Sequence, residues 1–480
     1  MSKIVIIDVD SDRSTYASLQ IANSFRHLKT DIEITLITTS PDKFLESTDV
    51  FKDVVVIPGE SRDFENLKKL LTIPASIHWD FLFNFSRDPS GVIISKFLKA
   101  SEYHGAYLQD GNELLFSNFT SYLHFHQAPG EILPIHQFQL YKSMIDFKEP
   151  VKVFKFFRES DVMKPVLRKI DEMRMSTQRK KIVLIDADMG SSEDPEIIKF
   201  VSGIFLSVIK YTDFLPVLFS GDADEKTLLI EDIQKFSKEK VYLVSLKDSA
   251  KATFFSLSEL VITDNPIHMN IADFVQRPSI FLGPSDDFSF SRSSACPGSL
   301  LILAPGLDVQ ALKRVQRAIP FLINHEKKNS QPAEVKLNAF QTLEVQATTY
   351  LDPVEWNSNE VPQDFWKWTF ISRYLMGLSD PDFKGSVPES KQYADVLNLM
   401  KDLTLKAMNK FSTEKKSVTL EESQQIKADS DHQGVFGYIL LLIHFLRGSE
   451  QLTGDKLPSD IKAGIENFNR FISSELLKIK

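Results

Sequence analysis

The stretch that decides the fold is LSELVITDNPIHMNIADFVQRPSIFLGPSDDF, from Leu257 to Phe288. It contains a short apolar strand, Leu260 to Thr263, which the polar run Asp264-Asn265-Pro266 closes. A helix is predicted to begin near Ile267, because a proline just before it suits the first helical turn. The end of a helix, a strand and a second helix therefore follow one another within this stretch.

A second strand, Ser279 to Leu282, comes next and breaks at Gly283-Pro284-Ser285. Strands that alternate with helices in this way are typical of a doubly wound parallel sheet, which binds ligands at the carboxyl ends of its strands. Asp264 and Asn265 lie at one such end, Ser285 lies at the next, and His268 lies in the first turn of the helix between them. We expect a ligand site there.

These residues resemble the carboxyl-terminal signature of the heptosyltransferases, glycosyltransferase family 9. The family pattern is an Asp, a small residue and a Gly, then a His that opens a helix, then a strand and a Gly-Pro-Thr-Asp loop. Here it reads Asp264 to His268 and Gly283 to Asp286, with Pro266 near the place of the family Gly. That substitution removes a close backbone approach that glycine permits.

The resemblance implies the GT-B architecture, in which two Rossmann-like domains face a cleft. It also implies an inverting transfer of a heptose-type sugar from a nucleotide-sugar donor to a glycan or lipid-linked, lipopolysaccharide-type acceptor in a bacterial cell, with no cofactor and no metal. In this hypothesis the donor phosphates are held by Asp264, Asn265, His268 and Ser285.

The composition is that of an ordinary globular protein. The 480 residues are 42% hydrophobic and 25% charged, with a net charge of −9, so we expect two or three domains and no nucleic-acid partner. The single cysteine, Cys296, excludes an internal disulfide framework and a cysteine-based zinc site. The amino terminus reads as a strand, so we expect a cytoplasmic protein, either free or peripheral at the inner face of the membrane.

Residues 1–150 are predicted to form the first Rossmann-like domain, on the acceptor side. Its opening strand, Lys3 to Asp8, is followed by alternating helices and strands. The run from Trp79 to Leu108 also resembles the family, whose members carry a similar strand, turn, helix and short strand with a Gly. In the family the first strand leads into a Gly-Asp pair that supplies the base, but here that pair falls on Arg13 and Ser14. The nearest acids are Asp10 and Asp12, and either is a candidate for the base that deprotonates the acceptor hydroxyl.

The same strand has two other interpretations. Ile4 to Asp10 resembles the nucleophile motif of haloacid-dehalogenase-type phosphatases, in which the first Asp, here Asp8, attacks phosphorus and magnesium assists. The acids are equally well explained as loop residues that solvate the end of a strand. The histidines His124, His126 and His136 have no common metal-site spacing, and alternation along a strand or loop explains them better.

Residues 164–326 are predicted to form the second Rossmann-like domain, on the nucleotide-sugar side. Its first strand, Lys181 to Asp188, closely repeats Lys3 to Asp10, which indicates a second half that begins in the same way. After the next strand the acid-rich loop at Gly221 offers Asp224 or Glu225 to the ribose hydroxyls. In the family a Lys that meets the diphosphate follows the first strand, whereas this chain has four acids there: Asp186, Asp188, Glu193 and Asp194.

Those acids favour an alternative function. Two unit charges about 4 Å apart interact by about 1 kcal/mol in water and more strongly in a partly buried site. Crowded carboxylates should therefore repel a nucleotide diphosphate in the absence of a divalent ion. The missing Gly-Asp pair points the same way, toward a catalytically inactive GT-B-fold protein used for binding or as a scaffold.

Residues 340–480 are predicted to form an all-helical extension, which the resemblance does not cover. Aromatic residues gather at its start, and three of the four tryptophans fall between Trp356 and Trp368. Packing of a helix onto the neighbouring domain explains this cluster better than a platform for sugar stacking. The extension also offers a surface for a protein partner.

Overall fold

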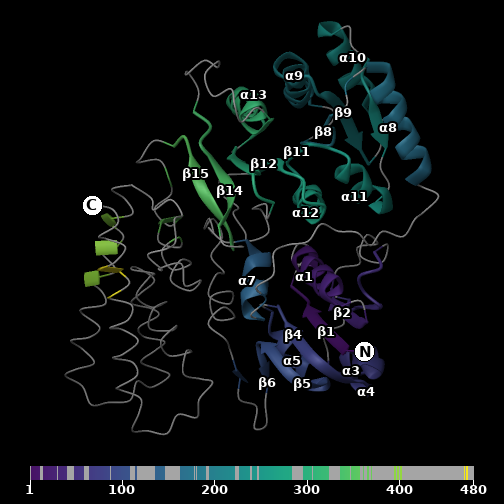
Figure 1. Cartoon of the computed structure of the whole chain (residues 1–480), viewed down its shortest axis with the longest axis vertical. Helices are drawn as coiled ribbons and strands as arrows, with labels where there is room; N and C mark the ends of the chain where they lie inside the picture. Colours follow the sequence, from purple (N-terminus) through teal and green to yellow (C-terminus); the bar gives the residue numbers. More distant parts are fainter. Residues whose placement is uncertain are drawn as a thin grey trace.

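The computed structural model of the chain describes two lobes, each built on its own sheet (Figure 1). We call residues 2–147 the first lobe and residues 163–356 the second lobe. The described residues are 2–10, 15–29, 31–39, 48–58, 64–86, 88–108, 114–115, 136–145, 147, 163–177, 179, 181–190, 194–221, 226–237, 240–245, 248–283, 296–304, 306–323, 336–345, 348–356, 361, 365–366, 369, 394–395, 397–398, 401–402, 470 and 472–473.

The first lobe holds a 5-stranded parallel sheet in the order β3-β2-β1-β4-β5. Its strands are β1 (Ser2–Asp8), β2 (Ile32–Thr38), β3 (Asp53–Val56), β4 (His78–Asn84) and β5 (Lys99–Gly105), and a small ribbon adds β6 (Tyr107–Leu108) and β7 (Leu114–Leu115). Its helices are α1 (Thr15–Leu28), α3 (Phe64–Leu70), α4 (Thr72–Ser76), α5 (Pro89–Phe97) and α7 (Gln137–Met144).

The central strand β1 shows why this lobe is doubly wound. Ile4 and Ile6 belong to the apolar cluster that contains α1 and α7, whereas Val5 and Ile7 belong to a second cluster with α3 and α5. The unbroken apolar run of β1 therefore buries both of its faces, as a parallel sheet covered by helices on both sides requires.

The second lobe holds an 8-stranded sheet in the order β10-β9-β8-β11-β12-β13-β14-β15. Its strands are β8 (Ile182–Asp186), β9 (Leu215–Ser220), β10 (Leu243–Ser245), β11 (Leu260–Thr263), β12 (Ser279–Gly283), β13 (Leu300–Leu303), β14 (Ala339–Val345) and β15 (Thr348–Val354). Its helices are α8 (Met163–Thr177), α9 (Pro195–Tyr211), α10 (Thr227–Phe236), α11 (Asp248–Ser256), α12 (Pro266–Phe274) and α13 (Val309–Ile323). One apolar cluster joins α9, α10 and α13 to one face of the sheet, and another joins α8, α11 and α12 to the opposite face.

In both sheets the order of successive strands reverses at the first strand, so that later strands are added on its other side. In the first lobe β1 lies between β2 and β4, and in the second lobe β8 lies between β9 and β11. The six parallel strands of the second lobe follow the Rossmann order 3-2-1-4-5-6, in which the ligand site lies where the order reverses. The predicted α/β class with two Rossmann-like sheets is confirmed, and the repeated strands Lys3 to Asp8 and Lys181 to Asp186 occupy equivalent central places.

The prediction that the chain becomes helical from residue 340 is wrong at its start. Strands β14 and β15 form an antiparallel hairpin that extends the second sheet from β13. Phe340 and Thr342 are buried, while Gln341 and Leu343, which follow each of them, are only partly buried, so the pattern has the period of a strand. Pro353 is tolerated because β15 is an edge strand. The described residues from Phe365 onward are helical, and most of the predicted extension lies outside the described residues.

Aromatic side chains pack the first described turn of the extension against this hairpin. The ring of Phe340 lies 5.1 Å from that of Trp356 and 4.7 Å from that of Phe365, and Trp366 is buried beside Phe365. The indole N–H of Trp356 donates to the carbonyl of Ala339 at 2.8 Å. These contacts confirm packing for the described members of the aromatic cluster. Trp368 lies outside the described residues.

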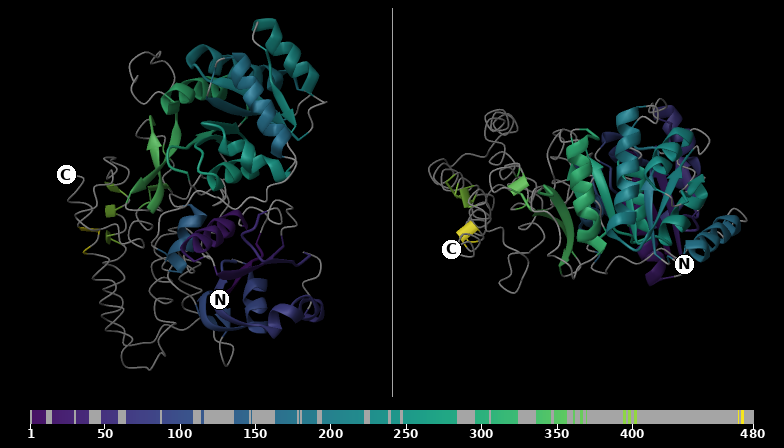
Figure 2. Two further views of the ribbon diagram at one scale, coloured as in Figure 1. Left: turned by 45° about the vertical axis from the view of Figure 1, so that its right-hand side comes forward. Right: turned by 90° about the horizontal axis from the view of Figure 1, so that it is seen from above.

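The two lobes meet directly. Helix α1 of the first lobe contacts α12 of the second, and Figures 1 and 2 show the two helices side by side between the sheets. Their apolar residues, such as Tyr16 and Met269, belong to one continuous cluster. The backbone N–H of Thr349 also donates to the Gln139 side chain at 3.4 Å. The predicted cleft between the lobes stays a prediction.

No helix in the part of the chain that the structure describes has both the length and the apolar character needed to cross a bilayer.

Candidate functional site

The candidate site lies where β8 and β11 end side by side. The two strands are parallel, with Ile185 opposite Ile262, so Asp186 and Thr263 come level at their carboxyl ends. The turns that follow carry Asp188 and Gly190 after β8, and Asp264 and Asn265 after β11. The order of the sheet therefore brings together two polar segments that are about 75 residues apart in the sequence.

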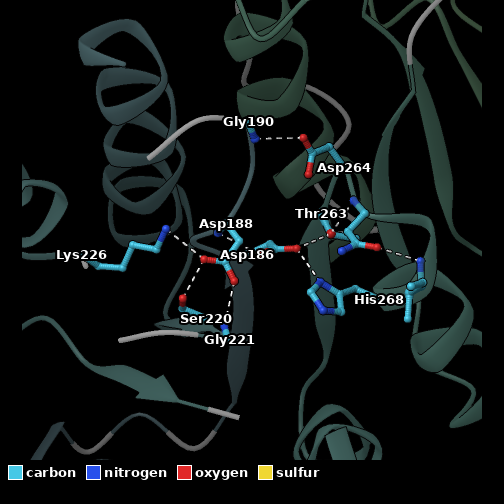
Figure 3. A network of polar contacts seen from close by, with 11 residues as sticks. Asp186, Asp188, Gly190, Ser220, Gly221, Lys226, Thr263, Asp264 and His268 are labelled. Atoms are coloured by element: carbon cyan, nitrogen blue, oxygen red, sulfur yellow. Dashed lines mark hydrogen bonds and ion pairs between the residues drawn. The ribbon is translucent and has the colours of Figure 1, made fainter. Parts of the chain in front are cut away.

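Asp186 is the centre of the polar network in Figure 3. Its side chain is fully buried, and its Oδ2 accepts hydrogen bonds from the Thr263 hydroxyl at 2.6 Å and from His268 Nδ1 at 2.6 Å. Its Oδ1 accepts the backbone N–H of Asp188 at 3.0 Å. A buried carboxylate requires such partners, because an unpaired charge away from water is costly. Asp186 therefore fixes the turn after β8 to the start of α12.

His268 lies in the first turn of α12 and is held on three sides. Its side chain is 5% exposed, and its ring packs edge-on against Phe219 and Phe255, with ring centroids at 5.1 Å and 6.0 Å. Since Nδ1 donates its hydrogen to Asp186, the neutral ring is in the tautomer that leaves Nε2 as an acceptor. This carboxylate–imidazole pair orients the histidine in the way that catalytic and binding histidines are commonly oriented.

The amino terminus of α12 uses several of its own donors. The Asn265 side chain accepts the backbone N–H of Ile267 at 2.9 Å and so caps the helix, and Pro266 at the first helical position has no N–H. Of the main-chain donors in the first turn, the backbone N–H of His268 is then the one left for a ligand. Fewer main-chain donors are therefore offered to an anion here than at an uncapped helix start.

Asp264 connects the two turns on the side away from His268. Its Oδ2 accepts the backbone N–H of Gly190 at 3.2 Å. Burial and the neighbouring Asp186 carboxylate raise the pKa of Asp264 from 3.8 to about 6. Gly190 has a φ of 60°, a conformation that favours glycine.

Replacing Asp264 by asparagine should remove a pH dependence of stability. In the unfolded chain Asp264 releases its proton near pH 4, but in the folded chain it does so near pH 6. Between these values the native state holds more protons, so this group lowers the free energy of unfolding as the pH rises from 4 through 6, by about 2 kcal/mol. Urea unfolding at pH 4 and pH 7.5 should show Asp264→Asn gaining about that much relative to wild type at the higher pH. A difference between the two proteins that stays constant with pH would contradict the assignment.

Asp188 is held by a second set of partners at the end of β9. The Ser220 hydroxyl donates to its Oδ1 at 2.6 Å, and the Gly221 backbone N–H donates to its Oδ2 at 2.8 Å. The ammonium group of Lys226 lies 2.9 Å from Oδ1. Burial alone would raise the pKa of Asp188, but the hydrogen bonds from Ser220, Gly221 and Lys226 outweigh it and lower the pKa.

The acids of the first lobe lie at the equivalent edge of the other sheet. Asp8 is buried and accepts a hydrogen bond from the Ser18 hydroxyl of α1, which ties the strand to the helix. Asp10 accepts the backbone N–H of Asp88 at 2.8 Å and joins the turn after β1 to the turn after β4. A buried Asp8 is badly placed to attack a phosphorus atom, so the structure does not favour the phosphatase hypothesis.

The predicted site residues are only partly brought together. Asp264, Asn265 and His268 lie in one network, as the sequence predicted, whereas Asp10 lies in the other lobe. Four predicted site residues lie outside the described residues: Asp12, Asp224, Glu225 and Ser285.

The histidines singled out in the sequence do not form a described metal site. His136 caps α7, because its Nδ1 accepts the backbone N–H of Phe138 at 2.9 Å, and burial lowers its pKa to about 3. His124 and His126 lie outside the described residues. Among the residues that are described, no three His, Cys, Asp or Glu side chains gather as metal ligands.

Sequence reasoning missed Thr263, Lys226, Ser220 and Gly190 as members of the network. Thr263 had a signal, since it is the last residue of the strand that precedes Asp264. Lys226 had none, because it reaches Asp188 only through the pairing of β8 with β9.

No protein-family model and no curated protein matches the sequence. Solved structures similar to the chain include a family 9 glycosyltransferase from Veillonella parvula (12% identity, 68% of this chain and 98% of that one, TM-score 0.47). Others are the ADP-heptose lipopolysaccharide heptosyltransferase II of E. coli (14%, 68% and 99%, 0.42) and a UDP-GlcNAc 2-epimerase from Neisseria meningitidis (12%, 68% and 92%, 0.34). The matched structures thus include the family whose signature the sequence resembles, but at this level of similarity no residue role is carried over from them.

Proposed function

We propose that the second lobe binds a nucleotide sugar at the carboxyl ends of β8 and β11, and that the chain transfers the sugar with inversion. One observation supports this proposal above all. The strand order reverses between β8 and β11, where ligands of doubly wound sheets bind, and Asp186, Asp264 and His268 meet there. A heptose-type sugar is the donor that the sequence signature suggests.

The acids near this edge are less repulsive than their number suggests. Lys226 neutralises Asp188, and the Asp186 carboxylate accepts hydrogen bonds from Thr263 and His268. Asp264 carries its charge less readily, since its pKa is raised to about 6. These contacts reduce the repulsion that the sequence predicts between these acids and a nucleotide diphosphate, and so support the proposal.

His268 is assigned to the donor phosphates in this proposal. Asp186 fixes Nδ1, so Nε2 is the nitrogen that donates to a phosphate oxygen once the ring is protonated. Asp264 and Asn265 position the turn, and Ser285 completes the phosphate contacts. Asp224 or Glu225 binds the ribose hydroxyls. The acceptor is a glycan or lipid-linked hydroxyl, for which Asp10 or Asp12 is the base.

Replacing His268 by alanine should weaken nucleotide-sugar binding about 10-fold or more, the value of one hydrogen bond to a charged group. Isothermal titration with ADP-, UDP- and GDP-sugars measures it. The matched control is His78→Ala, because the His78 side chain is exposed at the start of β4 in the first lobe and its only hydrogen bond among the described residues is to Ser101. Wild-type protein that binds none of these donors would refute the proposal.

A binding or scaffold protein without catalysis is the second candidate. It is favoured by the start of α12, where Asn265 and Pro266 leave few main-chain donors for a phosphate. The two functions separate on one comparison. An enzyme should transfer the sugar to an acceptor or hydrolyse the donor slowly, and Asp10→Asn or Asp12→Asn should abolish that activity. A protein that binds the donor but shows neither activity would favour the scaffold function.

A further inference from the structure

The partners of Asp188 form an arrangement that is familiar from sites for oxyanions. A hydroxyl, a backbone N–H and an ammonium group converge on the two oxygens of one carboxylate, at 2.6, 2.8 and 2.9 Å. This set of donors, which Ser220, Gly221 and Lys226 supply, is the kind that binds a phosphoryl group in proteins. The end of β9 therefore carries the donors of an anion site.

Burial distinguishes this arrangement from a surface ion pair. The side chain of Lys226 is 5% exposed, whereas that of Asp188 is 36% exposed. The cation is thus fixed inside the protein, and the anion that neutralises it is reached from solvent. Among the described residues Asp188 is the acid that pairs with Lys226.

The backbone leaves room for a group larger than a carboxylate. A side-chain carbon added at Gly221 would lie 3.7 Å from Asp188 Oδ2, and it would meet no other atom within 4 Å among the described residues beyond its chain neighbours. Figure 3 shows Lys226, Ser220 and Gly221 around Asp188, on the far side of Asp186 from His268.

We propose that Ser220, Gly221 and Lys226 form a binding site for a phosphoryl group, and that the Asp188 carboxylate is its internal occupant. A ligand phosphate enters this site only when Asp188 swings outward, so wild-type protein holds the site closed. The site differs in every residue from the proposed donor-phosphate contacts at α12 and stands without them.

Replacing Asp188 by alanine should open the site. The variant leaves a buried ammonium group, a hydroxyl and an N–H without their anion, so added oxyanions should bind in its place. We expect inorganic phosphate to bind at least 10-fold more tightly to Asp188→Ala than to wild type by isothermal titration, and formate to raise its unfolding temperature saturably at constant ionic strength. Comparison of inorganic phosphate with AMP separates a free phosphate from the phosphate of a nucleotide.

Three controls define the outcome. Asp194→Ala also loses a carboxylate that accepts a backbone N–H, but from the exposed cap of α9, so it should show no anion response. Asp188→Ala combined with Lys226→Met should lose the response, while Asp188→Ala combined with His268→Ala should keep it even if the proposed function fails. Equal phosphate affinity in Asp188→Ala and wild type would overturn the proposal.

The proposal can still be tested if Asp188→Ala does not fold under ordinary conditions. If Asp188→Ala folds in phosphate but not in chloride, the proposal is supported. If it folds in neither, Asp188→Asn keeps the shape of the side chain and removes its charge. That variant should bind phosphate at least 3-fold more tightly than wild type, and an unchanged affinity would count against the site.

Discussion

Replacing Asp186 by alanine is expected to lower the free energy of unfolding by about 3–5 kcal/mol, because several buried donors lose their shared acceptor at about 1–3 kcal/mol each. Asp186 is fully buried and accepts hydrogen bonds from Thr263, His268 and the backbone of Asp188. Its removal leaves these donors without an acceptor in the interior. Chemical denaturation of the two proteins at pH 7 measures the difference.

The control for this prediction is Asp194→Ala. Asp194 accepts the backbone N–H of Glu196 at 2.8 Å as the exposed cap of α9, and loss of such a cap costs about 1 kcal/mol. An Asp186→Ala variant no less stable than this control would show that the network around His268 contributes little, and the orientation of His268 would then need another explanation.

Replacing Gly105 by alanine is expected to cost about 3 kcal/mol or more, since backbone strain and a steric clash add together. Gly105 ends β5 with a φ of 93°, and a side-chain carbon there would lie 1.9 Å from the backbone oxygen of Asn84. That oxygen belongs to β4, which is paired with β5 at this position, so it cannot move without disturbing the sheet. Thermal unfolding should show the loss as a large drop in midpoint.

Gly298 provides a matched comparison. It has a similar φ of 86°, but a side-chain carbon added there would meet no atom within 4 Å among the described residues beyond its chain neighbours. Gly298→Ala should therefore cost only the strain, about 1–2 kcal/mol. If the two alanine variants lose the same stability, the close approach of Asn84 to Gly105 is not a real constraint on the sheet.

Much of the fold could be predicted because local and tertiary signals agree. The stretch from Leu257 to Phe288 was predicted as strand, helix and strand, and β11, α12 and β12 lie there with boundaries within one residue. Pro266 begins α12, as its fixed backbone angle favours. The likeness of Lys3 to Asp10 and Lys181 to Asp188 also marked the two central strands correctly.

The hairpin of β14 and β15 was missed for a physical reason. Strand β14 pairs with β13, and the paired residues Ala339 and Ile302 lie more than thirty residues apart, so no local sequence pattern indicates the contact. Once the strands pair, the alternation of the buried Phe340 and Thr342 with the less buried Gln341 and Leu343 can be understood. The charged run from Lys327 to Lys336, which precedes them in the sequence, is typical of a linker between domains and hid the continuation of the sheet.

The candidate site was half visible in the sequence. Asp264, Asn265 and His268 were found because they follow a strand and open a helix, which are local features. The acids Asp186 and Asp188 are visible in the sequence, but their partners are not, because His268 lies in α12 and Lys226 lies at the start of α10. Repulsion was predicted from charges counted along the chain, and only the order of the sheet shows which charges are neutralised.

The central claim is that nucleotide sugars bind where β8 and β11 end. A crystal structure of the protein soaked with a nucleotide diphosphate sugar, chosen as the tightest ligand by titration, tests it directly. The account predicts the diphosphate beside His268 and the turns at Gly190 and Asp264. A donor that binds in solution but lies elsewhere in the crystal structure, without contacts to these turns, would contradict it.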